Sequence, residues 1–285
     1  MEEMYGEATQ NSFPRMYLFG DSLTDRAFFQ SDNGFGWKLR EYYDGRVEVC
    51  NCGVSGFTSR WLRDYFDETI IQCAERRGPP APLLITIFLG ANDACLPPLS
   101  AHVPLPEFEQ HIRHYVDTIL ENPATKGTRV VLITPPPINV HAPEKSEVEI
   151  PSVAGVLESV ARNGKGHQSW LSKRIYAERV LKIAQEYESK TDLVTVLDFW
   201  KAVTMAGCAE KGDTPEAAAN KFRLSDIEDQ LPGSGLPGAK EFANGFFTDR
   251  LHLDCLGYRV LSRELLDLIT TKWPELTRNA LPLLE

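Results

Sequence analysis

Leu83-Leu84-Ile85-Thr86-Ile87-Phe88-Leu89 is an almost wholly apolar stretch in the first third of the chain. A run of this length and composition predicts a β-strand that is buried on both faces, because a half-exposed strand would alternate polar and apolar side chains. Strands of this kind are typical of parallel sheets, which carry helices on both faces. The stretch therefore predicts a parallel sheet between two layers of helices.

Four shorter apolar runs complete the predicted sheet, and helical patterns lie between and after them. The runs are Met16–Phe19, Val47–Asn51, Val130–Ile133 and Val194–Leu197. The helical patterns, with apolar residues at a spacing near 3.6, are Trp37–Tyr43, Trp61–Cys73, Pro106–Ile119, Trp170–Tyr187 and Tyr258–Ile269. This alternation predicts an α/β fold with a doubly wound, five-stranded parallel sheet in a three-layer α/β/α sandwich.

Two stretches show neither helical nor strand periodicity. Asn139–Gln168 is charged and contains glycine, and Gly207–Phe246 is rich in glycine and proline. Long irregular segments in a compact domain are often lids or binding loops, and they are about as often solvated insertions, so both interpretations stay open. We divide the chain into a flexible N-terminal segment, residues 1–14, and one domain over residues 15–285.

The composition excludes several classes of protein. The 285 residues are 42% hydrophobic and 25% charged, as in a folded soluble protein. The formal net charge of −10 argues against a nucleic-acid-binding surface, which needs clustered Lys and Arg. No apolar stretch approaches the roughly 20 residues that span a bilayer, and no signal peptide is visible. Six cysteines without a secretion signal indicate reduced thiols, so we expect a cytoplasmic protein without stable membrane insertion.

Polar residues follow the predicted strands at the carboxyl edge, where open parallel sheets bind ligands. Gly20-Asp21-Ser22 follows the first strand, Gly53 the second, and Gly90-Ala91-Asn92-Asp93 the third. Asp249-Arg250-Leu251-His252 lies between the fifth strand and the last helix. A serine nucleophile needs a base, an orienting acid and oxyanion donors, and these segments contain all of them. The pattern predicts a serine esterase.

Each of these residues has a predicted role. Ser22 attacks an acyl carbonyl, His252 takes its proton and passes it to the leaving alkoxide, and Asp249 orients the imidazole. Asp249 and His252 are three residues apart, a spacing that places both side chains on one side of a turn. The predicted oxyanion donors are the Ser22 N–H, the Gly53 N–H, which no Cβ screens, and the Asn92 side-chain amide.

These blocks resemble, in order and in placement, the four sequence blocks of the GDSL, or SGNH, hydrolases. Further stretches are similar to the isoamyl acetate-hydrolysing esterase subgroup, namely Gly56–Trp61, Gly90–Cys95, Val103–Leu105 and Ile133–Pro137. The resemblance implies a single flavodoxin-like domain, a Ser-His-Asp triad, no cofactor and no metal. It also implies hydrolysis of small carboxylic esters such as acetates, and it allows a homodimer. Gly207–Phe246 is longer than the resemblance leads us to expect, which leaves the acyl and alcohol preference open.

Other functions stay open on this fold. A lipase, a thioesterase or a carbohydrate O-acetylesterase would use the same residues. A non-catalytic ligand-binding protein is expected to lack one of the blocks, and none is missing. A metal-dependent phosphodiesterase would need a cluster of His and Asp ligands, which the sequence does not show. His111 and His114 are one helical turn apart, and we expect them at the surface or at a helix edge.

Individual residues have competing interpretations. Ser22 alone resembles a helix cap, with Asp25 as the acid of a capping box, but the other blocks favour catalysis. Asp93 is expected to fix the Asn92 loop through hydrogen bonds. Asp254 competes with Asp249 as the partner of His252 and is expected to point elsewhere. The apolar tail Leu281–Leu284 is expected either to dock on a partner subunit or to fold back over the site.

Overall fold

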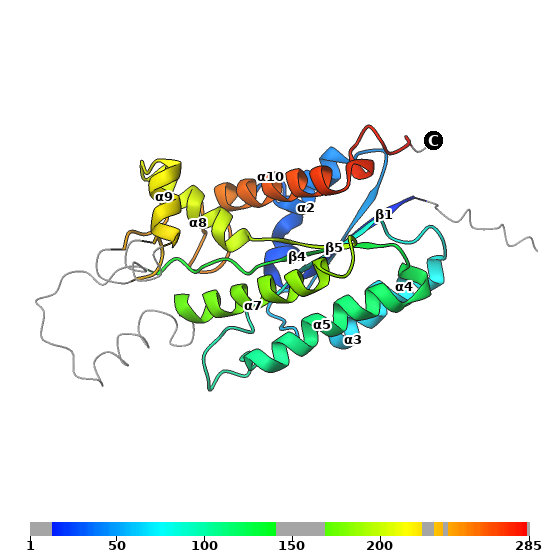
Figure 1. Cartoon of the computed structure of the whole chain (residues 1–285), viewed down its shortest axis with the longest axis horizontal. Helices are drawn as coiled ribbons and strands as arrows, with labels where there is room; N and C mark the ends of the chain where they lie inside the picture. The colour runs from blue at the N-terminus through cyan, green and yellow to red at the C-terminus, as the bar shows by residue number, and fades with distance from the viewer. Residues whose placement is uncertain (1–12, 141–168, 224–230, 236–238, 284–285) are drawn as a thin grey trace, which may run out of the picture.

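The computed structural model describes residues 13–140, 169–223, 231–235 and 239–283. A parallel sheet with the strand order β2-β1-β3-β4-β5 runs through the molecule (Figure 1). Its strands are β1 Arg15–Gly20, β2 Glu48–Gly53, β3 Leu84–Phe88, β4 Arg129–Ile133 and β5 Val194–Leu197. The predicted five-stranded parallel sheet is confirmed.

Helices cover both faces of the sheet (Figure 1). One layer contains α2 (Phe35–Tyr42), α8 (Phe199–Glu210) and α10 (Cys255–Lys272). The other contains α3 (Arg63–Phe66), a π-helical turn (Asp67–Ile71), α4 (Gln72–Arg77), α5 (Leu105–Glu121) and α7 (Trp170–Glu188). Shorter elements are α1 (Ser22–Asp25), α9 (Pro215–Arg223) and the 3-10 turns Arg26–Phe28, Pro123–Thr125 and Pro274–Leu276.

Each face of the sheet has its own apolar core. Met16 and Leu18 of β1 pack into the core beneath α2 and α10, whereas Tyr17 and Phe19 pack into the core beneath α5 and α7. This is the alternation expected of a strand whose successive side chains point to opposite faces. All five residues of β3 are buried, so the prediction made from the Leu83–Leu89 stretch is confirmed.

Because of the strand register, the carboxyl ends of the five strands are aligned. Gly20 at the end of β1 pairs with Gly53 of β2 and with Phe88 of β3. Phe88 pairs with Ile133, and Ile133 pairs with Leu197. The loops that follow all five strands therefore open on the same edge, which is where the predicted site residues lie.

The prediction of an irregular Gly207–Phe246 segment is partly wrong. Helix α8 extends to Glu210, and α9 occupies Pro215–Arg223 within that segment. Gly207 does not mark the start of a loop. It lies inside α8 and is packed against Phe242, since a Cβ at this position would lie 2.6 Å from the Phe242 ring. Residues 1–12, 141–168, 224–230 and 236–238 lie outside the described residues, so the predicted N-terminal segment and lids stay predictions.

The C-terminal tail lies near the edge where the strands begin, opposite the edge that carries the predicted site residues (Figure 1). Leu281 packs into the core beneath α2, and its carbonyl accepts a hydrogen bond from Arg46, which lies just before β2. The prediction that the tail folds over the site is therefore wrong for the described part of the tail.

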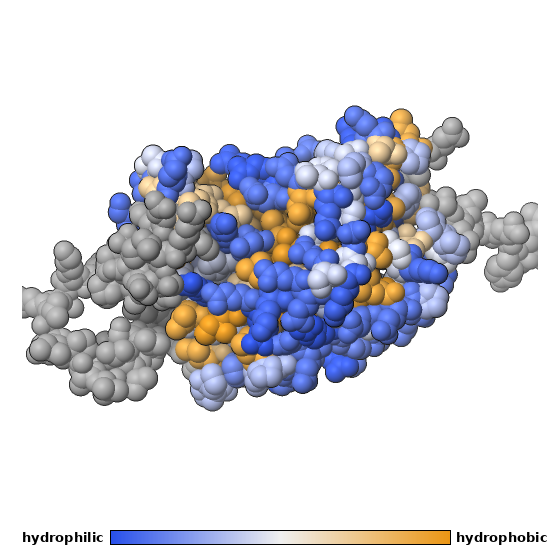
Figure 2. Space-filling view, viewed as in Figure 1, coloured by the Kyte–Doolittle hydropathy of each residue, from blue (hydrophilic) through white to orange (hydrophobic). Residues whose placement is uncertain are grey.

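The surface in Figure 2 is largely polar, with an apolar patch over the N-terminal end of α7. Leu171 and Ile175 of α7 are 51% and 41% exposed. Among the described residues, no helix has the combined length and apolar composition that crossing a bilayer requires.

Candidate active site

Ser22 is the first residue of α1, two positions after Gly20 at the end of β1. The cap of this helix is Asp21, whose carboxylate accepts a hydrogen bond of 2.9 Å from the Leu23 N–H. The alternative that Ser22 is itself the cap is therefore wrong. At the first helical position the Ser22 N–H has no intrahelical acceptor, which leaves it available to a ligand.

Three residues predicted from the sequence form a hydrogen-bonded line. Ser22 Oγ lies 3.0 Å from His252 Nε2, and His252 Nδ1 lies 2.7 Å from Asp249 Oδ2. The second oxygen of Asp249 accepts hydrogen bonds from the backbone N–H groups of Leu251 at 2.7 Å and His252 at 2.8 Å. Asp254 points elsewhere, as predicted, and caps α10 by accepting a hydrogen bond from the Cys255 N–H. The two ends of the line are brought together by the fold, since 230 positions separate Ser22 from His252.

Asp249 is held in its ionised form. Partial burial would raise the pKa of this carboxyl, but the hydrogen bonds from the His252 ring and from the two backbone N–H groups outweigh burial and keep the pKa below its ordinary value. An ionised carboxylate beside Nδ1 fixes the tautomer that carries a proton there. Nε2 is then an acceptor that faces the Ser22 hydroxyl, which is the arrangement of a general base.

Asn92 lies in the loop after β3, and its side chain is anchored. Its Nδ2 donates to the Phe57 carbonyl at 2.8 Å, and because an amide nitrogen carries two hydrogens, one stays available to a ligand. The neighbouring Asp93 carboxylate accepts from the Ser59 N–H at 2.9 Å and from the Ser59 Oγ at 2.5 Å. The prediction that Asp93 fixes this loop is confirmed.

Gly53 lies at the end of β2, but its N–H is engaged. It donates to Asn51 Oδ1 at 3.0 Å, while Asn51 Nδ2 donates to the Asp25 carbonyl at 3.0 Å. A Cβ on Gly53 would lie 2.2 Å from the Asp25 nitrogen. Glycine is thus required here for the close approach of β2 to α1, and the predicted donor role would need Asn51 to release the N–H.

Gly56 is a residue that sequence reasoning missed. It occupies the turn Val54–Phe57, closed by a hydrogen bond of 3.3 Å from the Phe57 N–H to the Val54 carbonyl, with a φ of +82°. Ser55 Oγ anchors this turn to Asp25 Oδ2 at 2.6 Å. Within the described part of the chain, the Gly56 N–H has no hydrogen-bond partner. A glycine placed third in a four-residue turn was the available signal.

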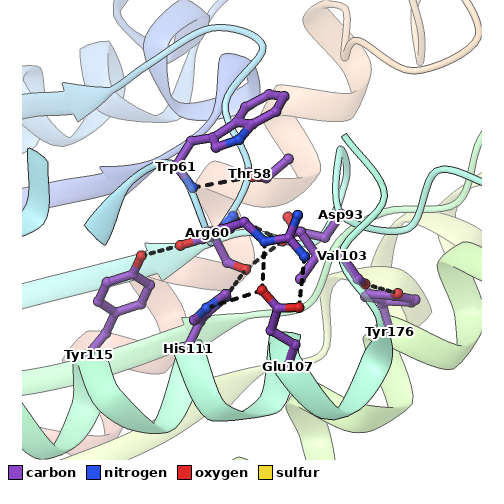
Figure 3. Close-up of polar contacts among 10 residues, drawn as sticks. Thr58, Arg60, Trp61, Asp93, Val103, Glu107, His111, Tyr115 and Tyr176 are labelled. Atoms are coloured by element: carbon purple, nitrogen blue, oxygen red, sulfur yellow. Dashed lines mark hydrogen bonds and ion pairs between the residues drawn. The ribbon is translucent and has the colours of Figure 1, made fainter. Parts of the chain in front are cut away.

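A second Ser-His-Asp grouping, of Ser59, His111 and Asp93, is buried, and Figure 3 labels its His111 and Asp93. Ser59 Oγ lies 2.5 Å from Asp93 Oδ1 and 2.9 Å from His111 Nδ1. Ser59 and Asp93 are fully buried and His111 is 6% exposed. The expectation that His111 lies at the surface is wrong, because α5 turns this residue inward toward Ser59, with Glu107 3.7 Å from its other nitrogen.

The chemistry of this buried grouping differs from that of the Ser22 line. Here the serine is central, so its hydroxyl bonds directly to the carboxylate and no imidazole separates the two. Burial also lowers the pKa of His111, which keeps the ring neutral. Through its hydrogen bonds to Asp93 and His111, the fully buried Ser59 joins its own loop to the Asn92 loop and to α5.

Burial also acts on the two acids beneath the site. It raises the pKa of Asp21 to about 7, although the Leu23 N–H opposes the shift. It raises the pKa of Asp93 to about 6, against the hydrogen bonds from Ser59.

Asp21→Asn should stabilise the protein more at alkaline than at acidic pH. An unfolded Asp has a pKa of about 3.9, whereas that of folded Asp21 is about 7, so the folded state holds the additional proton between these values. The contribution of Asp21 to stability therefore falls as pH rises through this window. Asparagine can keep the cap on Leu23 without the charge. Melting temperatures of both proteins at about pH 5 and pH 8 test this; an equal difference at both would contradict it.

Most of the chain is similar in sequence to known proteins. Residues 16–265 match the family model of the GDSL-like Lipase/Acylhydrolase. A GDSL esterase/lipase of Arabidopsis thaliana is 29% identical over 237 residues, which cover 80% of this chain and 90% of that protein. The isoamyl acetate-hydrolyzing esterase 1 homolog of Rattus norvegicus is 32% identical over 200 residues, which cover 70% of this chain and 71% of that protein.

Solved structures share the fold. The lipase/acylhydrolase from Enterococcus faecalis has a TM-score of 0.55 at 18% identity, covering 96% of this chain and 100% of that one. A Geobacillus acetyl-xylooligosaccharide esterase has a TM-score of 0.52 at 20% identity, covering 90% and 93%. With the family match over most of its length, the chain belongs to the GDSL-like lipase/acylhydrolase family and is a carboxylic-ester hydrolase.

Proposed function

We propose that this protein hydrolyses small carboxylic esters through an acyl-enzyme formed on Ser22. The observation that carries the proposal is the hydrogen-bonded line from Ser22 Oγ through His252 to an ionised Asp249, at the edge where the strands end. A hydroxyl is a weak nucleophile by itself, and a base that is oriented by a third group activates it.

In the proposed mechanism the ester carbon is attacked by Ser22 Oγ while Nε2 of His252 takes the hydroxyl proton. The tetrahedral intermediate collapses when the ester C–O bond breaks, and Nε2 returns the proton to the leaving alkoxide. Water then attacks the acyl-enzyme by the same route, releasing the acid and restoring the serine. Asp249 stays ionised throughout and stabilises the imidazolium that forms in each half.

Besides the Asn92 side-chain amide, three backbone N–H groups are candidates to stabilise the oxyanion. The Ser22 N–H is one donor, because its helical position leaves it without an acceptor. The other two are the backbone N–H groups of Gly53 and Gly56. Availability favours Gly56, since Asn51 occupies the Gly53 N–H in this structure. The amide proton of the true donor should shift downfield when a phosphonate adduct forms on Ser22, which NMR of the labelled enzyme measures.

Asn92→Ala should lower kcat about 10²- to 10³-fold and leave KM little changed, because the amide stabilises charge that develops only in the transition state. Asn92→Asp should be at least as impaired, since it places a carboxylate beside the developing oxyanion. Steady-state kinetics, with melting temperatures as the check on folding, measure both. A normal kcat in the alanine variant would refute the proposed role of Asn92 as an oxyanion donor.

Short acyl esters such as acetates are the proposed substrates. The chain is similar to isoamyl acetate-hydrolyzing esterase 1 homologs, and apolar surface lies next to the proposed oxyanion donor. Phe57, whose carbonyl anchors Asn92, is 38% exposed, and its ring packs edge-on against that of Trp61, which is 42% exposed, with centroids 6.1 Å apart. Exposed aromatic rings at this position offer apolar contact to the hydrocarbon part of an ester.

The proposal is tested with p-nitrophenyl esters of increasing acyl length, with isoamyl acetate, and with a fluorophosphonate whose site of attachment is mapped by mass spectrometry. Turnover that falls as the acyl chain lengthens, with the label on Ser22, is the expected result. A label on another residue would refute the nucleophile, and a preference for long acyl chains would point to a lipase instead.

A further inference from the structure

Lys173 lies on α7, and its side chain is fully buried. A buried ammonium is unfavourable unless it is paired, so the groups around it explain why it is there. Its Nζ donates a hydrogen bond to the Ala91 carbonyl, which immediately precedes Asn92. Lys173 is therefore bonded to the backbone of the loop that carries the proposed oxyanion amide.

The same ammonium acts on acids from two loops. Asp21 and Asp93 are both fully buried, and each keeps one carboxylate oxygen without a hydrogen-bond partner among the described residues. Lys173 lowers the pKa of each carboxyl, in opposition to burial, whereas burial lowers the pKa of Lys173 itself. One side chain is thus electrostatically coupled both to the residue before Ser22 and to the residue after Asn92.

Neighbouring residues of α7 hold the rest of this loop. Ser172 Oγ donates to the Ala94 carbonyl at 2.8 Å, and the Tyr176 hydroxyl donates to the Val103 carbonyl (Figure 3). The first turns of α7 therefore support the loop after β3 at several points. Of these three residues of α7, Lys173 alone combines a bond to this loop with an electrostatic effect on the turn that carries Ser22.

We propose that Lys173 is a positioning residue of the esterase, which fixes the Asn92 loop relative to the Ser22 turn. The inference rests on the proposed function, because it concerns the distance between a nucleophile and an oxyanion donor. A displacement of about 1 Å in such a pair can cost about a hundredfold in rate. Removing the amino group takes away the hydrogen bond to the Ala91 carbonyl and the electrostatic partner of Asp21 and Asp93, so the Asn92 loop loses a bond to α7 and its electrostatic coupling to the Ser22 turn.

Lys173→Met is the first test, because methionine keeps the length of the side chain and removes the charge and the donor. We expect kcat to fall about ten- to hundredfold, with KM changed less than about threefold, at a temperature where the variant is folded. The matched control is Lys182→Met on the exposed face of the same helix, which should behave like the wild type. A role in folding alone would lower the melting temperature without lowering the kcat of the folded protein.

The double variant Lys173→Met/Asp21→Asn addresses a loss of folding. It removes one of the two acids that would lack a counter-charge, and it should melt higher than Lys173→Met. Compared with Asp21→Asn alone it should still lose kcat about tenfold or more, since the Ala91 contact stays absent. Unchanged kcat in either comparison overturns the inference while Ser22 labelling stands. Absence of Ser22 labelling in the wild type overturns the proposed function itself.

Discussion

Ser22→Ala should reduce ester hydrolysis by at least about 10⁴-fold and abolish labelling by a fluorophosphonate, because among the described residues the only other hydroxyl that contacts an imidazole is that of the fully buried Ser59. The variant should fold, since the Ser22 side chain makes its one hydrogen bond to His252 and the cap of α1 is Asp21. Turnover of p-nitrophenyl acetate and the mass of the labelled protein measure the result. Retained labelling would place the nucleophile elsewhere.

Ser59→Ala is the matched control, because Ser59 also contacts a histidine and an aspartate. It is fully buried, so its removal should leave the fluorophosphonate on Ser22 and lower kcat at most about tenfold through loosening of the Asn92 loop. Loss of labelling in a folded Ser59→Ala protein would reverse the assignment of the two groupings. The pair of variants therefore distinguishes the Ser22 line from the Ser59 grouping.

His252→Ala should impair kcat about as severely as Ser22→Ala, because a nucleophile and its base act as one unit. For the same reason the double variant should be no slower than either single variant. Asp249→Asn should cost less, about 10²- to 10⁴-fold, since this carboxylate orients the ring and its side chain is 54% exposed. Kinetics with p-nitrophenyl acetate give all three values, and additive losses would show that Ser22 and His252 act separately.

His114→Gln is the control for a histidine change. His114 lies on α5 with its ring against Tyr115, and we place no part of the reaction on it. Wild-type kcat is expected. A large loss in His114→Gln, with His252→Ala active, would contradict the assignment of the base.

The sheet could be predicted from the sequence because its strands are short apolar runs separated by helical patterns. The Ser22 line could be predicted because strand ends in a parallel sheet meet at one edge, which converts separation along the chain into proximity in space. Asp249 was distinguishable from Asp254 by its spacing to His252 alone. These inferences need only local pattern and topology.

Other features depend on tertiary contacts that no local pattern encodes. Gly53 and Gly56 are three residues apart and look alike in the sequence. In the structure the Gly53 N–H donates to the Asn51 side chain, whereas the Gly56 N–H has no hydrogen-bond partner among the described residues. His111 and Lys173 are polar residues whose burial depends on partners from other segments, Ser59 and Ala91. Lys173 had a weak signal, since it shares the buried stripe of α7 with Trp170, Tyr176, Ala177 and Val180.

Because the strands end at one edge of the sheet, β1, β2 and β3 each contribute their own loop to the site. The Val54–Phe57 turn is joined to the end of β1 through the Val54 N–H, to α1 through Ser55 and Asp25, and to the Asn92 loop through Phe57. Replacements within this turn that keep Gly56 would alter the wall that a substrate meets and leave Ser22, His252 and Asp249 in place. Chimeras made by exchanging this turn between relatives are thus a route by which selectivity can diverge on a constant catalytic frame.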